Sequence, residues 1–253
     1  MSAEAPEAAP AETERMGPLV HRAVRHGAIM LILGAVAFLV GNIVTQLLWN
    51  SSAPYGSYSL LHNYISDLGA VNCGTEGSGS MARMVCSPGH DVFNALIVVM
   101  GLLIVGAVLL LRTAFPPRRS STIGLGLLAL AGIGAIGVGL SPEDVDLTVH
   151  TASALVAFLF GNLALIVLGF AMFRDTRWDG YRAYSILSGL VGLVALILFV
   201  AGAVGPLGFG GMERLIVAPI LLWAIVAGIH LVRIPTYAPS GIRTSSGRRS
   251  GTG

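Results

Sequence analysis

The sequence has few charged residues and no lysine. Charged side chains make up 11% of the 253 residues, whereas soluble globular domains carry about a quarter. Apolar residues make up 54% of the chain, and the mean hydropathy is +0.78. This composition excludes an ordinary soluble domain and predicts an integral membrane protein.

Six apolar stretches are long enough to cross a bilayer, because the hydrocarbon core is about 30 Å thick and a helix rises about 1.5 Å per residue. They run approximately over residues 27–49, 92–111, 122–140, 149–173, 183–204 and 215–232. Backbone amides in lipid need partners within their own segment, and the alternating pattern of a membrane barrel is absent. The predicted fold class is therefore all-α, a polytopic bundle of six transmembrane helices.

Both ends of the chain differ in composition from the predicted helices. Residues 1–18 are rich in Ala, Glu and Pro, and residues 235–253 are rich in Ser, Gly and Arg. We expect disordered tails over these two ranges. Between them, residues 19–234 form the predicted membrane domain, with a long loop over about residues 50–90.

The fifteen basic residues are all arginines, and their distribution predicts the orientation. Only Arg83 and Arg214 fall on one side of the predicted bundle. The other side carries Arg15, Arg22, Arg25, Arg112, Arg118, Arg119, Arg174, Arg177, Arg182, Arg233, Arg243, Arg248 and Arg249. The positive-inside rule places both termini in the cytoplasm of a multi-pass cell-membrane protein. Orientation and anionic membrane lipids explain the net charge of +2, so no nucleic-acid partner is expected.

The loop over residues 50–90 contains both cysteines, Cys73 and Cys86. Thiols oxidise readily outside the cytoplasm, so two cysteines in an exported loop predict a disulfide. Closing a loop of this size contributes about 3 kcal/mol in the chain-entropy model. Paired free thiols and a metal site are the alternatives.

Acids and histidines gather on the side opposite the arginine-rich segments, near the starts of the second, fourth and sixth helices. Helix N-termini present unpaired amide hydrogens and about half a positive charge, so three of them side by side would attract an anion. Arg214 could then contact two oxygens of that anion. We therefore expect an outward-facing cradle that binds an anionic lipid head group or a membrane partner. The predicted binding residues are Ser66, Asp67, His90, Asn94, His150, Glu213 and Arg214.

Ordinary structural roles could also explain these residues. Asp91, Asp146 and Glu213 fall in first turns or at N-caps, where acids are common. Asp67 could form a salt bridge with Arg214 that ties the loop onto the sixth helix. The segment from Ser66 to Gly69 could be a helical turn closed by a left-handed glycine.

A metal site is the sharper alternative. His62, His90 and His150 with one carboxylate would suit zinc and support an outward-facing hydrolase or acyl transferase acting on lipids. The sequence contains no HExxH motif, and no catalytic residue can be assigned from it. A small transporter has the least support, because no acid, lysine or arginine lies deep within a predicted helix.

Small and polar residues inside the helices predict close packing. Ala131, Ala135 and Gly139 fall four residues apart, which lets another helix approach, within the chain or in a homo-oligomer. Asn42, Gln46 and Asn162 are expected to hydrogen bond between helices, since each needs a partner in a dry medium.

Several blocks of the sequence resemble a known family. They are YISDLGAVNCG, VCSPGHDVFNALIVVMGL, GVGLSPEDVDLTVHTASALVAFLFGNLALIVLG and GGMERLIVAPILLWAIVAG. They are similar to the bacterial and archaeal membrane-protein family called domain of unknown function 998, over about residues 27–231. The resemblance implies a six-helix membrane fold without an assigned activity. The ISDLG element alone is also similar to one in a eukaryotic six-helix family that includes the autophagy modulator DRAM.

Overall fold

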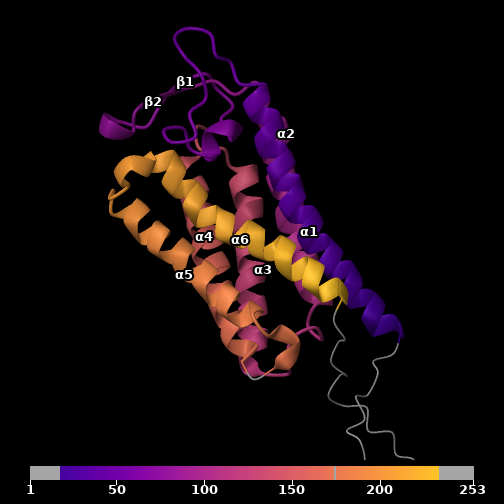
Figure 1. Cartoon of the computed structure of the whole chain (residues 1–253). Coiled ribbons are helices and arrows are strands. Elements are labelled where there is room, and N and C mark those ends of the chain that lie inside the picture. The colour runs from indigo at the N-terminus through magenta and orange to yellow at the C-terminus, as the bar shows by residue number, and fades with distance from the viewer. Residues whose placement is uncertain (1–17, 174, 234–253) are drawn as a thin grey trace, which may run out of the picture.

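A computed structural model describes residues 18–173 and 175–233, and it consists mainly of six long helices (Figure 1). They are α1 (Pro18–Leu47), α2 (His90–Leu110), α3 (Arg119–Leu140), α4 (Leu147–Ala171), α5 (Tyr181–Val200) and α6 (Gly208–Arg233). All six are long and apolar enough to span a membrane. The predicted all-α six-helix membrane fold is confirmed. The predicted tails lie outside the described residues, except for Pro18.

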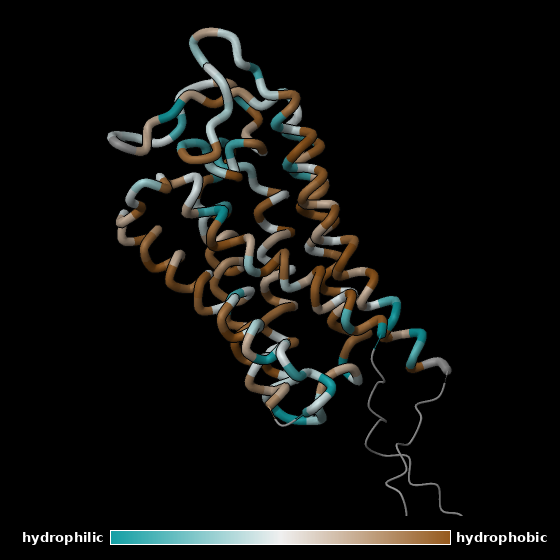
Figure 2. The backbone as a smooth tube through the Cα atoms, in the orientation of Figure 1, coloured by the Kyte–Doolittle hydropathy of each residue, from teal (hydrophilic) through white to brown (hydrophobic). Residues whose placement is uncertain are grey.

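The helices form a bundle with two distinct ends. Pro18 of α1 and Arg233 of α6 lie at the same end, here called the termini end, and the long loop between α1 and α2 covers the opposite end, the loop end (Figure 1). Consecutive helices pack on each other, α6 packs back on α1, and α4 also contacts α6. Apolar residues dominate the middle of the helices, and hydrophilic residues concentrate near the two ends (Figure 2).

Two helices begin well before the apolar runs that predicted them. α1 begins at residue 18 rather than about 27, and α6 begins at residue 208 rather than about 215. Hydropathy marks only the residues suited to hydrocarbon, whereas helical hydrogen bonding continues through the polar residues beyond them. As a result, Glu213 and Arg214 lie in the second turn of α6 and not at its start.

Glycines let α3 pack closely between α2 and α4. A Cβ atom on Gly134 would lie 2.6 Å from the backbone nitrogen of Ala157 in α4. A Cβ atom on Gly139 would lie 2.6 Å from the carbonyl oxygen of Asn94 in α2. Neither neighbour can move aside easily because both contacts are to helical backbone.

The predicted stripe of small residues on α3 is used within the chain. Ala131, Ala135 and Gly139 are all buried, and the two alanines line an internal cavity. This stripe is therefore not free to form a dimer surface, and self-association through it is not expected.

The polar residues inside the helices have different partners. Asn162 Nδ2 donates to the carbonyl oxygen of Ile216 at 3.2 Å, which joins α4 to α6 as predicted. Gln46 Nε2 instead donates to Asn42 Oδ1 within α1 at 2.6 Å, so the expected helix-to-helix role of this pair is wrong. The two residues are one turn apart, and a neighbour on the same helix satisfies the amide without a second helix.

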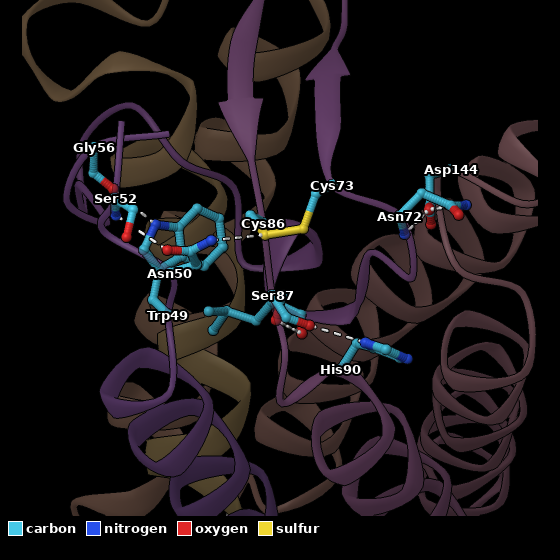
Figure 3. Close-up of a disulfide and its surroundings, with 11 residues drawn as sticks. Trp49, Asn50, Ser52, Gly56, Asn72, Cys73, Cys86, Ser87, His90 and Asp144 are labelled. Carbon is cyan, nitrogen blue, oxygen red and sulfur yellow. Dashed lines mark hydrogen bonds between the residues drawn. A yellow bond between two sulfur atoms is a disulfide. The ribbon is translucent and has the colours of Figure 1, made fainter. Parts of the chain in front are cut away.

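The long loop contains two 3₁₀ turns, η1 (Ser66–Gly69) and η2 (Gly79–Met81), and a hairpin of β1 (Gly74–Glu76) and β2 (Arg83–Val85). The sequence did not predict this hairpin. The predicted disulfide between Cys73 and Cys86 is confirmed, and it closes the base of the hairpin (Figure 3). Asn72, next to Cys73, bonds to Asp144 in the α3–α4 connection through its backbone nitrogen at 2.7 Å. The hairpin is therefore fixed over the bundle.

The close approach at Gly134 yields a stability prediction. Replacing Gly134 by alanine should lower the free energy of unfolding by about 1–3 kcal/mol, because the added methyl group overpacks the α3–α4 contact. The measurement is the unfolding midpoint of purified protein in detergent. Gly126→Ala is the matched control, since Gly126 is exposed on the same helix and its Cβ would meet nothing within 4 Å. Equal midpoints for the two variants would contradict the packing argument.

Candidate functional site

A buried ion pair lies at the centre of the loop end. Asp67 is 0% exposed, and both of its carboxylate oxygens accept from Arg83 Nε at 2.8 Å. Asn63 Nδ2 and the backbone nitrogen of Tyr64 donate to Asp67 Oδ2 at 2.9 and 3.0 Å. The predicted pairing of Asp67 with Arg214 is therefore wrong, because the hairpin brings Arg83 to Asp67 instead.

Arg83 also binds a second carboxylate. Its terminal nitrogen donates to Glu143 Oε1 at 3.0 Å, and its guanidinium carbon lies 3.8 Å from the centre of the Tyr64 ring. Ser66 Oγ donates to the other oxygen of Glu143, Oε2, at 2.8 Å. The network thus ties η1, β2 and the α3–α4 connection together.

Two carboxylates share one guanidinium in this network, so one negative charge is left over when both are ionised. Burial raises the pKa of Glu143 well above its ordinary value, and the neighbouring Asp67 raises it further. Arg83 and Ser66 oppose this shift by favouring the carboxylate form. A proton on Glu143 relieves the excess charge, because like charges that share a site cannot both ionise at low cost.

Among the described residues, Arg214 bonds only to uncharged groups. It donates to the carbonyl oxygens of Leu60, Asn63 and Gly210 at 3.0, 2.9 and 2.9 Å. Another of its nitrogens donates to the Tyr58 hydroxyl. Arg214 was predicted to bind two oxygens of an anion, but in the structure its guanidinium holds the loop backbone. Because α6 begins early, Arg214 lies under residues 58–63 and clamps that part of the loop onto the helix.

Glu213 and His150 each use only one side-chain polar atom. The backbone N–H of Ile65 donates to Glu213 Oε2. His150 Nδ1 lies 2.8 Å from the carbonyl oxygen of Ser141, which can only accept, so Nδ1 carries the hydrogen. The second atoms, Glu213 Oε1 and His150 Nε2, have no hydrogen-bond partner among the described residues. Both residues are only 7% exposed.

Two other predicted binding residues have local structural roles. His90 Nδ1 bonds to the carbonyl oxygen of Ser87 at 2.9 Å (Figure 3). Asn94 Nδ2 donates to the carbonyl oxygen of Gly69 at 2.9 Å. Gly69 closes a 3₁₀ turn as expected, but it is not among the glycines with positive φ. The glycine is needed because a Cβ atom there would lie 2.3 Å from Asn94 Oδ1.

The acids expected at helix N-termini divide into different roles. Asp146 Oδ1 accepts from the backbone nitrogen of Val149 at 3.0 Å, so Asp146 caps α4 as predicted. Asp91 lies in the first turn of α2 without a side-chain capping bond. Glu213 is not a cap, because it reaches across to the backbone of η1's neighbour Ile65.

The histidines are not arranged as a metal site. His62 and His150 both line one cleft, whereas His90 lines neither that cleft nor the internal cavity. Over residues 18–173 and 175–233, no three His, Cys, Asp or Glu side chains lie close enough to hold a metal ion. These positions give the zinc-dependent hydrolase alternative no support.

A cleft of about 970 Å³ opens beside the buried network. Tyr64, Ser66, Arg83 and Glu143 are among the residues that line it, together with residues of α4, α5, α6 and the α5–α6 connection. A smaller apolar cavity of about 90 Å³ lies within the bundle. Five residues line both spaces: Ser66, His150, Ala154, Phe158 and Glu213.

The family model for DUF998, described as a protein of unknown function, matches residues 32–230. The chain belongs to this family. The match includes the whole loop end and every residue of the buried network. No curated protein and no solved structure matched the chain. The DUF998 protein is thus a membrane protein whose family carries no assigned activity.

Sequence reasoning missed three features of the site in this DUF998 protein. Arg83 was one of only two arginines expected on this side, and nothing local distinguished it from Arg214 as the partner of Asp67. Tyr64 gave no signal, although its ring contacts Phe199 and Phe209 with centroids 5.9 and 6.0 Å away. Glu143 had no predicted partner. Its position next to Arg83 depends on a hairpin that has no strong hydropathy pattern.

The raised pKa of Glu143 predicts a pH dependence of stability in the DUF998 protein. The folded state binds this proton more tightly than the unfolded state. The proton therefore contributes fully to the free energy of unfolding below pH 4.5, the ordinary pKa of the group. It is lost as the pH rises through the raised pKa. Glu143→Gln keeps an uncharged group there, so this variant should lose less stability than wild type between pH 5 and pH 8.

The measurement is the unfolding midpoint in detergent across this pH range. Asp91→Asn is the control, because the Asp91 side chain is 95% exposed and lies outside the network. A Glu143→Gln variant with the same pH slope as wild type would contradict the assignment of the proton.

Proposed function

We propose that this protein binds a membrane lipid, with the lipid head group in the cleft at the loop end. The observation that supports this proposal is that the two spaces lie next to each other and share lining residues. Polar groups line the cleft next to the network, and an apolar cavity shares five residues with it. A ligand that is polar in one part and apolar in another fits this arrangement.

The dimensions and surroundings of the cleft suit a lipid better than a water-soluble ligand. Its volume of about 970 Å³ lies at the upper end of the usual range for ligand pockets, about 300–1,000 Å³. Leu147 and Val200 line the cleft and are 65% and 73% exposed. Exposed apolar side chains on membrane-spanning helices face lipid, so the cleft opens among groups that a lipid chain can contact.

The buried network supports this proposal by fixing the polar side of the cleft. Arg83, Glu143 and Ser66 all line the cleft, and each is held by hydrogen bonds to another member of the network. Satisfied buried networks are rigid, because each bond restrains the groups on both sides. A rigid wall reduces the ordering that a bound head group would require.

Lipid binding predicts that closing the cleft removes a copurifying lipid. Ala154 lies on α4 where the cleft meets the cavity, so Ala154→Phe places a ring in the shared space. The retained lipid should fall about tenfold relative to wild type, equivalent to about 1.4 kcal/mol of binding free energy. The measurement is quantitative mass spectrometry of lipids that remain on protein purified in mild detergent.

Ala152→Phe provides the matched control for this experiment. Ala152 is exposed on the same helix and lines neither space, so the same substitution there should leave the retained lipid unchanged. Equal lipid retention by Ala154→Phe, Ala152→Phe and wild type would overturn the proposed function.

We also propose that the protein lies in the cell membrane with its loop end on the outer side and both termini in the cytoplasm. The arginine distribution supports this orientation through the positive-inside rule. The disulfide in the loop supports it too, because disulfides persist in oxidising surroundings.

Labelling from outside intact cells tests the orientation. A membrane-impermeant thiol reagent should label Ser51→Cys, an exposed position in the loop, and should not label Thr176→Cys. Thr176 is exposed in the short turn η3 (Thr176–Trp178) between α4 and α5, at the termini end. Lysed cells give the control, since both positions should then react. The reverse pattern in intact cells would show that the orientation is inverted.

A further inference from the structure

The head-group side of the cleft offers hydrogen-bond acceptors that lack donors. Glu213 Oε1 has no partner among the described residues, and neither does His150 Nε2, which is an acceptor in the neutral ring. Both residues are more than nine-tenths buried, and both line the cleft and the cavity. Acceptors that line the cleft and lack a donor among the described residues can accept from a ligand that supplies N–H or O–H groups.

The charge of the surrounding groups does not favour an anion. Asp67, Glu143 and Glu213 carry three negative charges when ionised, whereas Arg83 and Arg214 carry two positive charges. With the proton on Glu143, the two remaining carboxylates match the two arginines, so the set has no excess positive charge for an anion.

Neither arginine is free to receive a phosphate. Arg83 donates to Asp67, Glu143 and the carbonyl oxygen of Met81. Among the described residues, Arg214 donates to carbonyl oxygens and to the Tyr58 hydroxyl, and it does not line the cleft. The anionic head group expected from the sequence would therefore meet carboxylates without a matching cation.

Aromatic rings on the same cleft suit a cation. Tyr64, Phe199 and Phe209 line the cleft and contact one another, with the Phe199 and Phe209 centroids 5.7 Å apart. The faces of aromatic rings carry partial negative charge and attract ammonium groups. One face of Tyr64 already has the Arg83 guanidinium over it.

We infer that the cleft binds the primary ammonium group of a lipid head group, whose N–H bonds donate to Glu213 Oε1 and His150 Nε2. This inference rests on the proposed lipid binding and specifies the class of lipid. A quaternary ammonium lacks the N–H donors, and a glycerol head group lacks the positive charge. The two requirements together select an aminolipid.

The test is competition among three phospholipids with identical acyl chains and ethanolamine, choline or glycerol head groups. The full-length protein is placed in mixed micelles with all three, and native mass spectrometry measures the bound lipid. The ethanolamine lipid should be bound about tenfold more than either competitor. Equal or greater binding of the choline lipid, or of the glycerol lipid, would overturn the inference.

A substitution at Glu213 links this preference to the site. In Glu213→Gln, the amide oxygen can still accept from the backbone N–H of Ile65. The amide nitrogen takes the place of Oε1, so a donor replaces the free acceptor. This variant should lose the preference for the ethanolamine lipid, and the control Asp91→Asn should keep it. The competition with wild-type protein decides the inference even if Glu213→Gln does not fold.

The outcomes separate this inference from the proposed function. A lipid that is retained by wild type and lost in Ala154→Phe, but without head-group preference, overturns only the ammonium site. Lipid retention that is insensitive to Ala154→Phe overturns the lipid cleft itself.

Discussion

The pairing of Arg83 with Asp67 is the interaction on which the loop end depends. A carboxylate with no exposure to solvent needs a counter-charge and hydrogen bonds, and Arg83, Asn63 and the backbone of Tyr64 supply them. The same guanidinium reaches Glu143, so η1, β2 and the α3–α4 connection meet at one group. The disulfide holds the two strands that bring Arg83 to this position.

Two ionisable side chains of α6 hold the loop in place. Arg214 fixes the backbone of residues 60–63, and Glu213 fixes the backbone of Ile65. Ordering these neighbours leaves one oxygen of Glu213 and one nitrogen of His150 without donors. Ionisable groups on membrane-spanning helices are expensive to keep, so those that persist generally mark a binding or transport site. Helix packing does not require these ionisable groups, so their presence supports a binding role for the cleft.

The sequence anticipated some members of the site and misjudged others for a physical reason. Ser66, Asp67, His150 and Glu213 do gather at the loop end, as their common side of the bundle predicted. His90, Asn94 and Arg214 lie nearby but bond to backbone carbonyl groups. Position along a helix can be counted from the sequence, whereas the choice between a backbone partner and a ligand depends on which carbonyl groups the loop presents.

The sequence by itself determined the membrane fold, the six helices and the disulfide, because hydropathy, helix length and cysteine content are local properties that lipid and oxidation act on directly. Only the tertiary structure decided which charges are paired. Arg83 and Arg214 each carry one positive charge, so charge alone does not distinguish them in the sequence. A short hairpin with little hydropathy signal brings Arg83 to Asp67. The early start of α6 then placed Arg214 among carbonyl groups. That division of the two arginines leaves both of them bonded to protein groups.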